Sequence, residues 1–478
     1  MEVEHNEDDT KTINSDDSTL LLESSDSSIQ EPIDVNESCS ISFMIVLSLP
    51  RIAIAVAWGA QWAALGPLLE ILLPSSTVQL IQLVGPLSGL LVAPSIGVLS
   101  DNCTSRYGRR KPFLAIGTVL SIISWLMLMH AADLGQFLGD SSDDRSFMAS
   151  ITVACYISMD ITVNIAQVPV GLILADFAGD RQVTASTVGG LCSAVGFLLV
   201  ASYIFLFGPA HNSLKPFLAM LILVMFVTGG VVCCFVKEVP QENVIKKISW
   251  LKQLQQAFGA VYTGIRTLPP LLSSYFVILA LTQYGFASYN GTKGQFFGLV
   301  VMHGEALGAD TCGTNCSQAQ KSFNDGVQLA GSTDALGIFG LIVLGLLPKL
   351  VNRFGMQRVV TKALIPQIFL VLMAVYSENI VLDLLVVLGC GVTQCAIYSL
   401  AMPLIIHIVG HGESNQLGLF SGALNSAVCL GQLLNFVAAS VLVQTKFGYA
   451  APVFLGGLAS FLAFIVAITK LRVNMFSM

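Results

Sequence analysis

The chain has 478 residues, of which 54% are hydrophobic and only 11% are charged, and its mean hydropathy is +0.74. Because an ordinary soluble domain is about 25% charged, this composition excludes a soluble globular protein. The apolar residues form long runs, whereas the strands of a membrane barrel would alternate polar and apolar residues. The sequence therefore predicts an all-α membrane protein, in which each helix satisfies its own backbone groups.

Residues 1–40 differ from the rest of the chain. They hold 12 of the 30 acidic residues and one of the 23 lysines and arginines, so the remainder is mildly basic despite the net charge of −7. This composition predicts a disordered acidic cytoplasmic tail, and it lacks the basic and apolar regions of a signal peptide. Leu20 and Leu21 follow acidic residues, which is typical of a dileucine signal for a sorting adaptor, although so short a pattern also arises by chance.

Twelve apolar runs follow, each long enough to span a bilayer as a helix. The longest break splits them six and six. We therefore expect an N-terminal six-helix bundle over 41–235, a cytoplasmic central loop over 236–270 and a C-terminal six-helix bundle over 271–478. The predicted spans are 52–73, 78–99, 113–131, 147–177, 184–207, 214–235, 271–297, 327–350, 359–376, 381–408, 417–442 and 450–469.

The distribution of lysine and arginine sets the topology, because these residues in short loops stay cytoplasmic. They concentrate after even-numbered spans, at 106–111, in the central loop and at 349–362, which puts both termini inside. The loop with Cys312 and Cys316 then lies outside, where an oxidising compartment would allow the two thiols to bridge. Asn290 and Asn315 begin glycosylation sequons nearby, which are weak signals by themselves.

The loop between the second and third spans has a recognisable motif, Gly97-Val-Leu-Ser-Asp101-Asn-Cys-Thr-Ser-Arg106-Tyr-Gly108-Arg109-Arg110-Lys111. A glycine permits close helix approach, a carboxylate can cap a helix N-terminus, and fixed cations pair with acids. Arg353-Phe-Gly, after the second span of the latter half, repeats Arg106-Tyr-Gly. Such parallel half-repeats are how many transporters build a central site.

This loop resembles the signature loop of the major facilitator superfamily, with a Cys-Thr-Ser insertion. The resemblance implies the major facilitator fold, with 12 transmembrane helices in two six-helix halves. It also implies a conformational latch, with Asp176 at the end of the fourth span as its ionic partner. The alternative is a basic loop that only sets the topology. The predicted latch residues are Gly97, Asp101, Arg106, Gly108, Arg109, Arg110 and Asp176.

Further motifs narrow the resemblance. Gly85-Pro-Leu-Ser-Gly-Leu-Leu-Val-Ala-Pro94 runs into the loop, Trp58-Gly-Ala-Gln61 lies in the first span, and the fourth span reads Asp160-Ile-Thr-Val-Asn164-Ile-Ala-Gln167-Val-Pro169. Together they are similar to the sucrose/proton symporters of plants and their animal relatives. The similarity is dense over about 52–180 and thin in the second half, so it indicates the family better than the substrate.

Asp160 is the main candidate for a proton site, because a carboxylate in the middle of a span is costly unless it is paired, protonated or functional. Asn164 and Gln167 follow on the same helical face, which we expect to line a cavity. The amides of Asn164, Gln167 and Gln61 suit a hydroxyl-rich ligand, and Trp58 offers a platform for a sugar ring. The alternatives are interhelical hydrogen bonds for the amides and interface anchoring for Trp58.

The chain also departs from the family pattern. Gly171 and Gln328 stand where the plant symporters carry arginines, and Ser75 stands where they carry a histidine. If arginine normally helps the aspartate to release its proton, that coupling cannot operate in the same way here. Asp334, an acid with no obvious cation, is either a second proton carrier or a structural group. In the tenth span, two further polar residues are candidates for ligand contact: Gln394 and Tyr398.

The sequence thus predicts a secondary active transporter that moves a sugar, sucrose or a related glycoside, with a proton by alternating access. The alternatives are a passive sugar facilitator and a transport-inactive sugar sensor on the same fold. We find no nucleotide-binding loop or catalytic motif, and we predict no enzyme activity, cofactor, metal or nucleic-acid partner. The predicted partners are the sugar, protons and the lipid bilayer. A plasma-membrane location is favoured over a vacuolar or endosomal one.

Overall fold

The computed structural model describes residues 40–141, 144–178, 181–238, 250–409, 414–473 and 475. These residues form helices and their connections, and no strand occurs among them. Eleven helical segments are long and apolar enough to cross a membrane, and a bent pair, Gln318–Gly337 with Ile342–Phe354, brings the total to twelve. The prediction of an all-α, multi-pass membrane protein is confirmed, and the described residues hold eleven candidate spans, or twelve if the bent pair forms one span. The tail with Leu20 and Leu21 lies outside the described residues.

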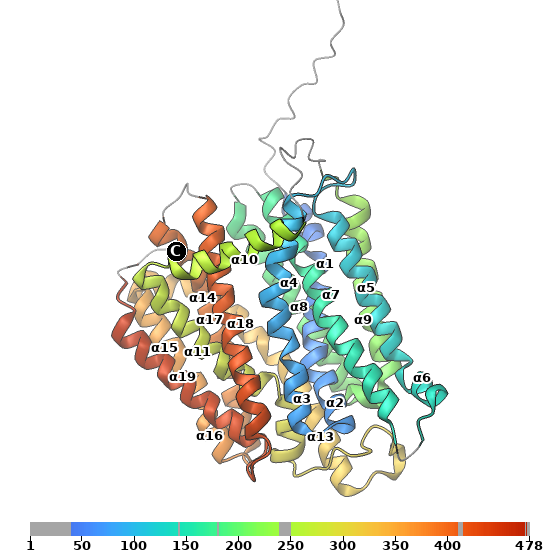
Figure 1. Cartoon of the computed structure of the whole chain (residues 1–478). Coiled ribbons are helices and arrows are strands. Elements are labelled where there is room, and N and C mark those ends of the chain that lie inside the picture. The colour runs from blue at the N-terminus through green and yellow to red at the C-terminus, as the bar shows by residue number, and fades with distance from the viewer. Residues whose placement is uncertain are drawn as a thin grey trace, which may run out of the picture. The chain divides into compact units, whose positions relative to one another are not determined.

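The first half contains six spans, several of them built from more than one helical segment (Figure 1). The elements are α1 (Ile41–Ala60), the π-helix η1 (Gln61–Leu65), α2 (Gly66–Leu72), α3 (Ser75–Gln82), α4 (Val84–Asp101), α5 (Lys111–Met129), the short α6 (Ala131–Leu138), α7 (Ser146–Ala178), α8 (Gln182–Phe207), the 3-10 turn η3 (Ala210–Ser213) and α9 (Leu214–Phe235). The first span begins at Ile41, eleven residues before the predicted start at residue 52, so it includes Pro50 and Arg51.

The second half repeats this plan. Its elements are α11 (Pro270–Asn290), α12 (Lys293–Gln295), the π-helix η4 (Phe296–Val301), the 3-10 turn η5 (Gly313–Asn315), α13 (Gln318–Ser332), the 3-10 turn η6 (Thr333–Gly337), α14 (Ile338–Phe354), α15 (Met356–Ile368), α16 (Leu370–Val375), α17 (Ile380–Val409), α18 (Ser414–Leu442) and α19 (Ala450–Lys470). Between the halves, the predicted central loop contains a further helix, α10 (Trp250–Arg266).

A π-helical turn interrupts the first span at Gln61–Leu65. Pro67 lies two residues after the end of this turn, and because proline has no backbone N–H it cannot donate to the carbonyl four residues earlier. The local widening of the helix accommodates this missing bond, and such π-bulges are frequent at functional sites. Here it displays Gln61 and Trp62 on the cavity described below.

Each half packs around its own apolar core. One core consists of residues between Met44 and Val236, and a second consists of residues between Leu272 and Met475. The halves meet where α3 and α4 contact α18, and where α8 contacts α13 and η6. Helix α10 contacts both α4 and α18 and lies across their ends (Figure 1). We call this end of the spans the α10 side, and the end that carries α13 the α13 side.

Candidate functional site

Two neighbouring chambers, which share several lining residues, lie between the halves. The α10 chamber has a volume of about 780 Å³ and extends toward Val261 of α10. The central chamber, of about 340 Å³, reaches Gln61 in the first half and Tyr398 in the second. Trp58, Gln167 and other residues line both chambers. These volumes lie in the usual range of ligand sites, about 300–1,000 Å³.

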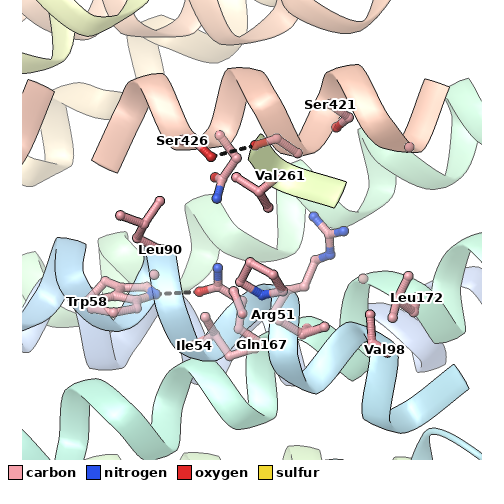
Figure 2. Close-up of a pocket in the computed structure, with 18 of the residues that line it drawn as sticks. Arg51, Ile54, Trp58, Leu90, Val98, Gln167, Leu172, Val261, Ser421 and Ser426 are labelled. Atoms are coloured by element: carbon pink, nitrogen blue, oxygen red, sulfur yellow. Dashed lines mark hydrogen bonds between the residues drawn. The ribbon is translucent and has the colours of Figure 1, made fainter. Parts of the chain in front are cut away.

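Three predicted residues of the first half form the wall of the central chamber. The indole of Trp58 donates a 2.7 Å hydrogen bond to Oε1 of Gln167, which joins α1 to α7 (Figure 2). The amide of Gln61 donates to the hydroxyl of Tyr156 at 2.8 Å, and its Oε1 has no partner. This wall therefore holds an aromatic ring in a fixed orientation beside the amides of Gln61 and Gln167, an arrangement suited to a hydroxyl-rich ligand.

Asp160 lies behind this wall rather than on it. Its side chain is completely buried, and neither carboxylate oxygen has a hydrogen-bond partner. Gly85 lines the central chamber and separates it from the Asp160 carboxylate. A methyl group added at Gly85 would lie 3.5 Å from Oδ1 of Asp160 and 3.6 Å from Nε2 of Gln61. The expectation that the helical face with Asp160, Asn164 and Gln167 lines the cavity therefore holds for Asn164 and Gln167. Asp160 itself does not line the chamber, because Gly85 lies between its carboxylate and the cavity.

Asn164 has both of the properties considered from the sequence, a position in the cavity wall and an interhelical hydrogen bond. It lines the central chamber, and its amide nitrogen donates to the hydroxyl of Ser88 at 2.9 Å and to the carbonyl of Asp160 at 2.8 Å. Ser88 lies on α4, so the amide also connects α4 to α7. The donor capacity of Asn164 is therefore committed to the fold, and its Oδ1 is the atom left for other interactions.

In the second half, the two predicted residues have different positions. Tyr398 lines the central chamber. Gln394 is buried and belongs to a row of glutamines behind the wall, in which Gln283 donates to Gln394 at 2.6 Å and Gln394 donates to Gln367 at 2.8 Å. Gln432, which does line the chamber, donates to Gln283 at 3.3 Å. Sequence reasoning missed this row, because its members lie on four different helices.

Asp334 does have a cation, contrary to the expectation from the sequence. The Nζ of Lys293 forms an ion pair with Asp334, and the two side chains are only 1% and 16% exposed. Lys293 lies 41 residues earlier in the chain, on α12, and neither residue lines the chambers. A second buried acid in this half, Asp383 at the start of α17, has no hydrogen-bond partner. Sequence reasoning overlooked Asp383, although it is an acid inside an apolar run.

The predicted latch residues gather on the α10 side. Arg110 is almost fully buried and contacts Asp101 at 2.5 Å, Asp176 at 3.3 Å and the Ser100 hydroxyl at 2.6 Å. Arg109 forms a 2.9 Å ion pair with Asp176. The cluster thus joins α4, the loop and α7 within the first half, and the pairing predicted for Asp176 is present.

Three other latch residues have different roles. Arg106 does not join the ion cluster but donates to the hydroxyl of Tyr107 and stacks on its ring. Gly108 has a φ of +103°, a conformation that favours glycine, and faces Glu238. Glu238, which sequence reasoning missed, accepts from the backbone N–H groups of Arg110 and Lys111. The reason given for Gly97 is wrong, since a methyl group there would meet nothing within 4 Å.

On the α13 side, polar contacts hold the two halves together. Glu70, in the first half, accepts hydrogen bonds from Tyr449 of the second half and from Ser75 of its own half. Three further pairs cross the same boundary: Gln82 with the Gly291 carbonyl at 2.9 Å, Arg145 with Asp310 at 2.6 Å, and His211 with Asn324 at 2.6 Å. The cavity is therefore closed by polar contacts on the α13 side.

The structure also locates the three departures from the family pattern. Ser75 donates to Glu70, and Gln328 donates to the Phe205 carbonyl at 3.1 Å, which is another contact between the halves. Gly171 lines the α10 chamber, and a methyl group there would lie 3.9 Å from Nη2 of Arg51. A guanidinium from α1 thus lies next to the position on α7 where the family resemblance led us to expect one. Sequence reasoning missed Arg51 because it placed the residue just outside the first span.

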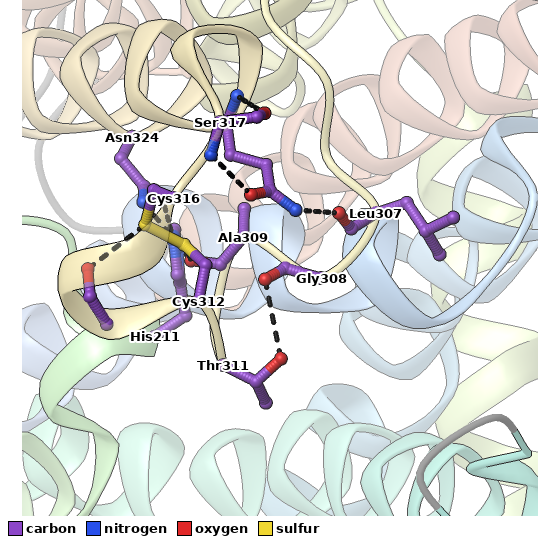
Figure 3. Close-up of a disulfide and its surroundings, with 11 residues drawn as sticks. His211, Leu307, Gly308, Ala309, Thr311, Cys312, Cys316, Ser317 and Asn324 are labelled. Atoms are coloured by element: carbon purple, nitrogen blue, oxygen red, sulfur yellow. Dashed lines mark hydrogen bonds between the residues drawn. A yellow bond between two sulfur atoms is a disulfide. The ribbon is translucent and has the colours of Figure 1, made fainter.

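The loop before α13 is closed by a disulfide between Cys312 and Cys316 (Figure 3), as the sequence suggested. Ser317 then caps α13 and forms a capping box with Gln320. Asn315 is exposed in this loop, whereas Asn290 is buried and lines the central chamber. The sequon at Asn290 is therefore inaccessible in the folded protein.

Comparisons with known proteins agree with this architecture. Residues 71–308 match the family of MFS/sugar transport proteins. The solved structures of the nucleoside transporter NupG and of a D-xylose-proton symporter superpose with TM-scores of 0.58 and 0.57, at 12% and 15% identity, over 90% of this chain and 99% and 98% of theirs. The chain therefore has the fold of the major facilitator superfamily.

Within the superfamily, the similarity to sucrose transporters expected from the sequence is also confirmed. The chain is 32% identical to sucrose transport protein SUC3 of Arabidopsis thaliana over 174 residues, which cover 34% of this chain and 29% of that protein. It is 26% identical to sucrose transport protein SUT1 of Oryza sativa subsp. japonica over 335 residues, covering 64% and 59%. The chain thus matches less than two thirds of the length of these curated relatives, both of which are named as transport proteins.

Proposed function

We propose that this protein transports a sugar, sucrose or a related glycoside, across a membrane together with a proton. The polar residues that face the central chamber come from both halves, which is the arrangement expected when two halves rock around a shared ligand. The ring of Trp58, the amide of Gln167 and the hydroxyl of Tyr398 would contact the sugar. The similarity to transporters named for sucrose supports this choice of ligand.

Asp160 carries the proposal of proton coupling. A carboxylate that is fully buried without a partner is costly in its charged form, and protonation removes the cost of burying the charge. Gly85 leaves the carboxylate within reach of the ligand chamber. Binding of a sugar against Gly85 would shield the protonated acid from water, and release of the sugar would expose it again. This is how proton and sugar movement would be linked.

Alternating access follows from the positions of the contacts between the halves. The contacts around Glu70 and Tyr449 close the α13 side, and the α10 chamber lies on the opposite side. The positive-inside prediction makes the α10 side cytoplasmic. The arrangement then corresponds to a state closed to the outside, and breaking the α13-side contacts would produce the opposite state.

A second candidate function is passive sugar facilitation, which the glycine at position 171 favours over strict coupling by the relatives' mechanism. Uptake of radiolabelled sucrose, maltose and glucose into proteoliposomes, with and without an inward proton gradient, separates the two. Symport predicts accumulation only with the gradient, and facilitation predicts equal rates. Measurable binding without any transport would instead support the sugar-sensor alternative.

Asp160→Asn tests the coupling residue directly. We expect the variant to exchange sugar between the two sides but to lose accumulation, because the amide cannot carry the proton. Glu378→Gln removes an exposed acid, whose side chain is 86% accessible, and serves as the matched control. Unchanged accumulation in Asp160→Asn would exclude Asp160 as the proton site.

The plasma membrane is the location we propose, with a vacuolar or endosomal membrane as the alternative if Leu20 and Leu21 bind a sorting adaptor. Replacing both leucines with alanine in the full chain tests the alternative. A shift from internal membranes to the cell surface would support the signal, and an unchanged distribution would remove it.

A further inference from the structure

Arg51 is a charged residue inside the first span that faces the α10 chamber. It extends from α1 toward α18, whose Ser421 and Ser426 line the opposite side (Figure 2). Its Nε atom has no hydrogen-bond partner, and no ion pair links Arg51 to an acid within the described ranges. An arginine in a membrane span without a counter-charge indicates a function, because the cost of placing it there is otherwise uncompensated.

The charge of Arg51 dominates the electrostatics of both chambers. Of the described residues that line them, Arg51 is the only charged one, and the others are apolar residues, amides, hydroxyls, tryptophans and a thiol. Asp160, the nearest acid behind the wall, is separated from the central chamber by Gly85 and lies three helical turns along α7 from Gly171, the residue that faces Arg51. A ligand in the cavity would therefore encounter a site of net positive charge.

The fold keeps space for the guanidinium. Gly189 of α8 packs against the Arg51 side chain, and a methyl group added there would lie 2.9 Å from Cδ and Nε and 3.0 Å from Cζ of Arg51. Such distances would force the arginine to move. The adjacent Gly190 has no atom within 4 Å of an added methyl group. The two glycines thus provide a matched pair of positions for testing whether the placement of Arg51 matters.

We infer that Arg51 is a specificity-determining residue that makes the cavity select sugars by charge. This inference rests on the proposed sugar-transport function. The guanidinium offers a planar set of donors that pairs best with carboxylates and also binds neutral hydroxyl oxygens. In a cavity of low dielectric it repels a cationic ligand. The site accordingly prefers a sugar with a carboxylate to its neutral analogue, and the neutral sugar to an amino sugar.

Binding to the purified full chain measures this order without requiring transport. The ligands are 4-nitrophenyl glucoside, the corresponding glucuronide and the corresponding 2-amino sugar, whose nitrophenyl group quenches the fluorescence of Trp58 and Trp62 in the central chamber. We expect the glucuronide to bind at least about tenfold more tightly than the amino sugar. Arg51→Lys should keep the order, because it keeps the charge, and Arg51→Gln should abolish it.

Two further variants test whether the placement of Arg51, rather than a general effect on folding, determines the preference for the glucuronide. Gly189→Ala should reduce the preference for the glucuronide by displacing Arg51, whereas Gly190→Ala should leave it unchanged. Arg266→Gln, which removes an exposed arginine of α10 outside the chambers, should also leave it unchanged. An order that persists in Arg51→Gln, or one that Gly189→Ala and Gly190→Ala change equally, would overturn the inference.

Quenching by inorganic ions tests the cavity charge without any sugar. We expect iodide to quench the tryptophan fluorescence more than caesium in the unmodified protein, and this excess to fall in Arg51→Gln but not in Arg51→Lys. If no glycoside binds while the iodide preference depends on Arg51, the sugar assignment fails and the charge assignment stands. If the iodide preference is the same in Arg51→Gln, the charge assignment itself is wrong.

Discussion

One buried acid from each half, Asp160 in the first and Asp334 in the second, shows opposite surroundings. In the first half, Asp160 has no partner and lies one glycine from the ligand chamber. In the second half, Asp334 is neutralised by Lys293 and lies away from both chambers. The comparison indicates that Asp334 maintains the fold, whereas Asp160 is available for protonation. Two similar acids inside apolar runs thus have different roles because of what packs beside them.

The largest expected effect is the loss of the Lys293 cation. Lys293→Met leaves Asp334 as an uncompensated buried charge, which should lower the free energy of unfolding by about 3–5 kcal/mol. Denaturant unfolding of the purified protein measures this loss. The double variant Lys293→Met with Asp334→Leu should recover most of it, and a double variant as unstable as the single one would contradict the structural role of the pair.

A smaller effect is expected in the ion cluster of the α10 side. Arg110→Gln removes a nearly buried arginine with two acid partners and should lower the free energy of unfolding by about 1.5–3 kcal/mol. Arg109→Gln removes a partly exposed pair and should cost about 1 kcal/mol or less. Equal losses for the two arginines in the same unfolding experiment would show that burial does not determine the strength of this cluster.

Glu70 differs from both Asp160 and Asp334, because it accepts hydrogen bonds from one residue in each half. Tyr449→Phe removes that partner and should destabilise the state closed on the α13 side by about 1 kcal/mol. Labelling of a cysteine introduced at Asn290, which lines the central chamber and is not one of these contacts, by a reagent added on the α13 side should become faster in the variant. Ser75→Ala removes a partner within the first half and serves as the control, so an equal increase in labelling would argue against a contact that holds the halves together.

The smallest effect on stability is expected at Asp160, the residue that we propose couples proton and sugar movement. Asp160→Asn removes no hydrogen bond or ion pair, so the free energy of unfolding should change by less than about 1 kcal/mol. Loss of accumulation without loss of stability would sharpen the contrast with Asp334. A destabilisation as large as that of Lys293→Met would mean that Asp160 is a structural group.

The sequence by itself determined the architecture of this protein. The number of spans, the division into two halves and the basic loops follow from composition over windows of about 20 residues, which is local information. Asp160, Asn164 and Gln167 were also predicted together, because their spacing alone puts them on one face of a helix. The prediction that Asp176 would be the ionic partner of the latch needed only the resemblance of one loop to a known motif.

The tertiary structure decided which polar side chains meet. Trp58 with Gln167, Lys293 with Asp334 and the row of glutamines around Gln394 each join residues on different helices, and no sequence window contains both partners. Arg51 was missed because an arginine after a proline is typical of the end of a span, whereas neighbouring glycines in the folded protein give it space inside one. Helix packing determines whether a polar residue faces lipid, a partner or the cavity, and packing depends on all the helices together.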